Sequence, residues 1–163
     1  MTDLRQHARR AAVALGLASA ALSLSWALGA TWLVDTVGGP AGATSGLTAS
    51  LVTLGAAGVK AAVALLPLVP HRWARPPALL AGWVLLAYGT VVALVGAGVL
   101  TGVVPSAPDA DLRAIAWHTL LWDPWFALWG AALLLSLRPA RGGGSADTHS
   151  PGRHLAGGWA GRR

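Results

Sequence analysis

Two ionisable residues, Lys60 and Asp123, lie deep inside long apolar stretches of this 163-residue chain. Lys60 is the only lysine, whereas the other eleven basic residues are all arginine. A lysine, unlike an arginine, can lose its proton when it is removed from water. A charge inside a membrane span is nearly always paired or turned toward a cavity. The two residues therefore predict either a structural ion pair or a proton or ion site, and both interpretations stay open.

The residues that share a helix face with Lys60 and Asp123 favour a direct interaction between them. At about 100° per residue, both faces consist mainly of small side chains. The Asp123 face contains Ala116, Thr119, Ala127 and Gly130, and the Lys60 face contains Thr53, Ala56, Ala57, Ala64 and Pro67. Because both segments are expected to enter from the outer side, they run parallel and place the two charges at similar depths. We therefore predict a Lys60–Asp123 contact inside a helical bundle.

Pro124 and His118 add polar groups near Asp123. Pro124 removes the N–H donor for the carbonyl of Leu120, which predicts a helix kink with a freed backbone oxygen. His118 lies nearer the outer boundary, where Asp35 is a candidate hydrogen-bond partner. The chain has no cysteine and no span holds a second histidine, so Cys-ligated metals and bis-histidine haem are excluded. We predict no metal and no cofactor.

Three tryptophans, Trp122, Trp125 and Trp129, form a stripe with His118 about 130° away from Asp123. Tryptophans of membrane helices usually gather at the water boundary, whereas these occupy the middle of an apolar segment. The stripe is interpreted either as a surface that packs on a neighbouring helix or lipid, or as an aromatic wall for a ligand or a quinone-like cofactor.

The composition and the apolar segments predict the elements that position these residues. The chain is 55% apolar and 11% charged, against about 25% charged residues in soluble globular domains. Four apolar segments are long enough to cross a bilayer, and Gly- or Pro-rich turns separate them. They cover residues 11–34, 47–69, 78–104 and 114–137. The expected fold is an all-α integral membrane four-helix bundle.

The arginines predict the orientation of this bundle. All except Arg113 precede the first segment, lie between the second and third, or follow the fourth. Under the positive-inside rule, both termini are cytoplasmic and the protein is a multi-pass protein of the cell membrane. This gives a cytoplasmic segment over residues 1–10, a membrane domain over residues 11–138 and a disordered basic tail over residues 139–163.

Both ends of the chain carry alternative interpretations. Ala18-Ser19-Ala20 resembles a signal-peptide cleavage site, but the apolar run continues beyond it and favours an uncleaved span. The tail is interpreted either as a solvated segment or as a contact to anionic lipids assisted by Trp159. Nucleic-acid binding is not expected, because the arginines are dispersed along the membrane boundaries.

Small residues recur at helical spacing in two segments and predict close helix packing. The first seam is Gly16, Ala20, Ser23, Ala27 and Ala30, and the second is Gly82, Gly89 and Gly96. The seven-residue period of the second seam predicts a compact left-handed bundle.

Several of these motifs together resemble a known family. They are Trp26-Ala27-Leu28-Gly29, Trp32 and Asp35-Thr36-Val37-Gly38-Gly39, then Lys60, then Tyr88-Gly89, and then Trp117-His118, Leu121-Trp122-Asp123-Pro124-Trp125-Phe126 and Trp129-Gly130. Over roughly residues 11–138 the chain resembles the actinobacterial membrane proteins of domain of unknown function 3995. The resemblance implies four spans and marks Asp35, Lys60, His118 and Asp123 as its polar positions. It implies no reaction.

Two functional classes remain. The first is a non-enzymatic membrane protein that acts as a structural, interaction or ligand-binding bundle, with the lipid bilayer and a second copy or another membrane protein as partners. The alternative is a small proton- or ion-coupled transporter or channel that works as an oligomer. No phosphate loop, nucleophile–base arrangement or paired carboxylates are present, so an enzyme is not favoured and no catalytic residue is predicted.

Overall fold

The computed structural model describes residues 2–36 and 46–138, and every regular element in these ranges is helical. The predicted tail over residues 139–163 lies outside the described residues. The long helices are α1 (Thr2–Ala27), α3 (Leu47–Leu65), α4 (His71–Leu100) and α6 (Asp123–Ser136). The shorter elements are η1 (Val34–Thr36), η2 (Leu66–Leu68), α5 (Leu112–Trp117) and the π-helical turn η3 (His118–Trp122).

The described residues form helices and no strands, so the all-α prediction is confirmed. Three helical stretches are long and apolar enough to cross a membrane. They are Asp3–Ala27, Leu47–Leu68 and Arg72–Leu100. The fourth predicted segment is helical from Leu112 to Ser136, but η3 divides it into shorter elements. The carboxylate of Asp111 caps its first turn by accepting from the backbone N–H groups of Arg113 and Ala114, both at 3.0 Å.

Several helix boundaries differ from the predicted segments, among them the end of α1 and the start of α4. Helix α1 ends at Ala27, because Gly29 adopts a φ of 96° and the N–H of Ala30 returns to the carbonyl of Ser25 at 2.9 Å. This is a glycine-terminated Schellman end. Helix α4 starts at His71 and continues through Pro76 and Pro77, which belong to the Pro-rich turn predicted before residue 78. Both prolines lie one turn beyond the start of α4, so the carbonyls of Arg72 and Trp73 lack their usual helical donors there.

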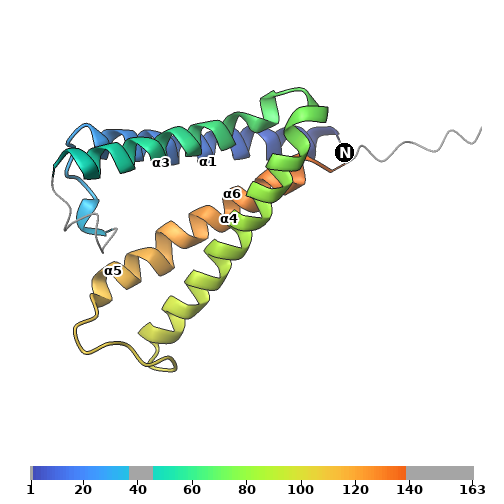
Figure 1. Cartoon of the computed structure of the whole chain (residues 1–163). Helices are drawn as coiled ribbons and strands as arrows, with labels where there is room; N and C mark the ends of the chain where they lie inside the picture. Colours follow the sequence, from blue (N-terminus) through green and yellow to red (C-terminus); the bar gives the residue numbers. More distant parts are fainter. Residues whose placement is uncertain (1, 37–45, 139–163) are drawn as a thin grey trace, which may run out of the picture.

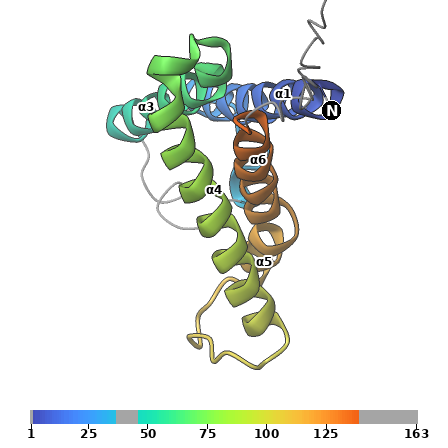
Figure 2. The same ribbon diagram turned by 90° about the vertical axis from the view of Figure 1, so that its right-hand side faces the viewer.

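The four long helices form two antiparallel hairpins, α1 with α3 and α4 with α6 (Figure 1). Helix α1 also packs against α6, which joins the hairpins. The hairpins lie close together where α1 begins and α6 ends, and they diverge toward the opposite end (Figures 1 and 2). This arrangement is more open than the predicted compact bundle. Beyond the close contact at Gly16, the indoles of Trp26, Trp122 and Trp125 occupy the space between α1 and the fourth helical segment.

The predicted glycine seam of α4 is confirmed as a packing surface. A side chain added at Gly82 would collide with Leu134, and one added at Gly89 would meet the backbone of Asp123 and Ala127. The absence of these side chains lets α4 approach the fourth helical segment at backbone distance. The first seam is confirmed at its first residue, where Gly16 packs against Ala64 and Trp129.

The end where the hairpins meet carries most of the described positive charge. Arg5 donates from Nε to the carbonyl of Ser136 at 3.0 Å, and so links the start of α1 to the end of α6. A cation at the C-terminus of a helix satisfies a free carbonyl and complements the helix dipole. The other described arginines at this end are Arg9, Arg10, Arg72, Arg75 and Arg138.

Candidate functional site

Asp123 is fully buried at the start of α6. Its Oδ1 lies 3.4 Å from Nδ1 of His118, whose side chain is 29% exposed. Its Oδ2 is buried and makes no hydrogen bond. A buried carboxylate with a free oxygen retains the capacity to bind a proton, a water molecule or a cation. Asp123 is therefore the centre of the candidate site.

The π-helical turn η3 brings His118 to Asp123. In a regular α-helix, residues five apart lie about 140° apart and cannot meet. In η3 the N–H of Asp123 instead bonds to the carbonyl of His118, so residues five apart fall on nearly the same face. The expected separation of His118 from the Asp123 face is therefore wrong. The side chain of Asp35, the partner suggested for His118, is not among the side chains that the structure describes, so this pairing stays a prediction.

The turn also explains how the helix accepts Pro124. The expected disturbance is present as a widened turn directly before the proline, and α6 continues regularly to Ser136. Widened turns of this kind often occur at functional sites.

Lys60 makes a polar contact that does not include Asp123. Its Nζ donates to Oγ of Ser23 at 2.8 Å and lies 5.4 Å from the ring centroid of Phe126. These partners place the ammonium group where α3 faces both α1 and α6. Neither contact is with Asp123, so the predicted direct Lys60–Asp123 pair is absent from the described contacts. The backbone at Asp123 packs against Gly89 of α4, whereas Lys60 reaches toward α1.

The tryptophan stripe packs between the fourth helical segment and the first part of the chain. Trp122 donates to Oγ1 of Thr36 at 3.2 Å and meets Trp26 edge to face at 5.8 Å. Trp125 donates to the carbonyl of Leu15 at 3.2 Å. Trp129 is 1% exposed and packs against Gly16. These contacts support the packing interpretation of the stripe.

Three polar residues of the site were not singled out as functional from the sequence. Ser23 and Thr36 are buried and accept hydrogen bonds from Lys60 and Trp122. Thr119 has a buried hydroxyl without a hydrogen bond, one turn before Asp123. Hydroxyl residues are common in apolar helices, where they also bond to their own backbone, so no sequence pattern distinguishes these three. Among residues 2–36 and 46–138, no group of three His, Cys, Asp or Glu residues is placed to hold a metal ion.

Comparison with known proteins gives a family and no activity. A family model described as "Protein of unknown function (DUF3995)" matches residues 16–133, which is most of the chain. The matched range contains His118, Asp123, Lys60 and Ser23. No curated protein and no solved structure matches.

Proposed function

The chain belongs to the DUF3995 family, and from this membership and the site at Asp123 we propose a non-enzymatic, proton-binding protein of the cell membrane. The observation that carries this proposal is the buried Asp123 carboxylate, which has one oxygen near His118 and the other unpaired. Carboxylate and imidazole groups inside membrane helices are typical of sites that take up and release protons.

We place both termini in the cytoplasm and count four spans. The fourth, from Leu112 to Ser136, is roughly 37 Å long at about 1.5 Å per residue, enough to cross the hydrocarbon core. Its only described acidic residue, Asp123, is buried in the protein and does not face lipid. In this orientation the diverging ends of the hairpins face outward, and so does partly exposed His118.

The topology is testable because the chain has no native cysteine. Single cysteines at Leu28 and Ser106, both exposed near the diverging ends, are expected to react with a membrane-impermeant maleimide on intact cells. Cysteines at Thr2 and Val69 are expected to react only after the cells are permeabilised. Protection of the Ser106→Cys variant on intact cells would contradict the four-span arrangement.

Proton binding at Asp123 is testable by infrared difference spectroscopy of the purified protein between two pH values. The parent is expected to show the C=O band of a buried protonated carboxyl group, and Asp123→Asn is expected to lose it. Asp109→Asn removes an exposed carboxylate from the loop between α4 and α5, so it serves as the matched control and should keep the band. A band that persists in Asp123→Asn assigns the proton to another group.

Proton-coupled transport is the second candidate, because Lys60 and Ser23 provide a further polar contact between α3 and α1. Transport requires access from both sides of the membrane, whereas binding requires only one. In sealed vesicles with a pH gradient, a transporter would dissipate the gradient faster than its Asp123→Asn and Lys60→Met variants. If the parent, both single variants and the double variant are all folded and dissipate the gradient at equal rates, the transport proposal is contradicted. Proton binding without transport then remains.

A further inference from the structure

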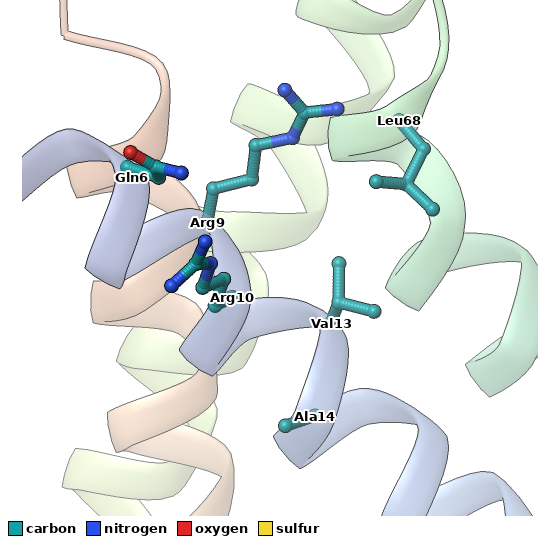
Figure 3. Close-up of a pocket in the computed structure, with 6 residues that line it drawn as sticks. All are labelled: Gln6, Arg9, Arg10, Val13, Ala14 and Leu68. Carbon is teal, nitrogen blue, oxygen red and sulfur yellow. The ribbon is translucent and has the colours of Figure 1, made fainter.

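A groove with a volume of about 380 Å³ lies beside the first half of α1, at the arginine-rich end (Figure 3). Its lining divides into two chemical types. The polar part is Gln6, Arg9 and Arg10, and the apolar part is Val13, Ala14 and Leu68. Because the polar residues precede the apolar ones along α1, the groove changes from charged to apolar along the helix axis.

The two arginines of the groove are available to a ligand. Both are exposed, and neither makes a hydrogen bond or an ion pair within residues 2–36 and 46–138. Two of the other arginines at this end make contacts within the protein, whereas Arg75 and Arg138 have no such contact among the described residues. Arg5 holds the carbonyl of Ser136, and the guanidinium of Arg72 lies 5.6 Å from the ring of Trp73. Arg9 and Arg10 therefore retain their full capacity to bind an anion.

The arrangement of the side chains matches a phospholipid. Figure 3 shows Arg9 extending toward Leu68, with the side chain of Val13 directed into the space between them. A guanidinium binds a phosphate through two parallel hydrogen bonds, and the apolar residues next to it suit an acyl chain. Basic pockets beside membrane helices on the cytoplasmic side bind anionic lipid headgroups by this combination.

We propose that this groove binds the phosphate of an anionic phospholipid of the cytoplasmic leaflet, with an acyl chain along Val13, Ala14 and Leu68. The proposal rests on the cytoplasmic orientation of this end under the proposed topology. A soluble phosphate compound would use the arginines alone and would leave the apolar half of the groove exposed to water. The lining therefore favours a lipid.

Native mass spectrometry of the full chain, released from nanodiscs of mixed phosphatidylglycerol and phosphatidylcholine, tests the proposal. The parent is expected to retain phosphatidylglycerol in preference to phosphatidylcholine. In the Arg9→Gln, Arg10→Gln double variant this preference should fall about 30-fold, since each basic residue contributes about 1 kcal/mol near an anionic surface. The matched control is Arg72→Gln, Arg75→Gln, which removes the same charge outside the groove and should change the preference less than threefold.

Three results would overturn the proposal. Equal losses in the two double variants would mean that the lipid responds to the overall charge of this end. An unchanged preference in Arg9→Gln, Arg10→Gln would place the lipid elsewhere. Loss of phosphatidylglycerol on addition of inorganic phosphate alone would assign the groove to a soluble anion. Cysteine labelling reports the topology independently, so a failed lipid site is distinguishable from a failed membrane arrangement.

Discussion

Replacement of Trp129 by alanine is expected to lower the free energy of unfolding in detergent by about 3 kcal/mol or more. Trp129 is 1% exposed and packs against Gly16 of α1, in a cluster that includes Leu133 and Ala64. Loss of the indole leaves a cavity where the two hairpins meet. At about 2–4 °C per kcal/mol for a chain of this size, the midpoint of thermal unfolding should fall by roughly 6–12 °C.

Two further variants separate packing from a general effect of losing a tryptophan. Trp83→Ala removes an indole that is 61% exposed, and it should change the unfolding temperature little. Trp129→Phe keeps most of the ring volume and removes an indole N–H that is buried without a partner, so its cost should be well below that of alanine. Equal decreases in the unfolding temperature for Trp129→Ala and Trp83→Ala would contradict the packing of Trp129 between the two hairpins.

The second large effect is expected at Gly89. The Cβ of a valine at this position would lie 2.5 Å from the backbone nitrogen of Ala127 and would also collide with the carbonyl oxygen of Asp123. Backbone atoms cannot rotate away, so α4 and α6 must separate. Overpacking in protein interiors typically costs about 1–3 kcal/mol, and Gly89→Val should reach or exceed the upper value.

Gly55→Val is the matched control, because a Cβ at Gly55 meets nothing within 4 Å. The readout is the fraction of monodisperse protein after extraction, together with the midpoint of thermal unfolding. If Gly89→Val yields no folded protein, Gly89→Ala provides the smaller step and should still be less stable than Gly55→Ala. Equal stability of the two alanine variants would mean that the close approach of α4 and α6 does not contribute to stability.

The lengths of the apolar runs and the spacing of small residues predicted most of the helical framework. Helix α3 starts at Leu47 as expected, and the seven-residue spacing of Gly82 and Gly89 identified the face of α4 that meets α6. These features depend on one helix at a time, so the sequence contains them directly. The divergence of the hairpins depends on how several indoles fill the space between helices, and single-helix periodicity does not contain that information.

The sequence predicted candidate residues for the site but not the contacts between them. Asp123, His118 and Lys60 were singled out because charged or polar groups are rare in apolar segments. The expected separation of His118 from Asp123 was wrong because a uniform rotation of 100° per residue was applied across His118–Trp122, where the helix is a π-turn. One widened turn rotates every residue before it relative to Asp123. Lys60 donates instead to the hydroxyl of Ser23 on α1, the helix that packs against α3.

The hydrogen bond from Arg5 to Ser136 also bears on how the protein is synthesised. The two residues are 131 positions apart, and the contacts of Leu15 with Trp125 and of Gly16 with Trp129 likewise join the first helix to the last. During translation, α1 is made first and its partner α6 emerges last. The ribosome must therefore complete nearly the whole described chain before the first helix acquires its full set of neighbours. A chain truncated before α6 retains the α1–α3 hairpin but lacks the α4–α6 hairpin and the contacts of α1 with α6 that join the two.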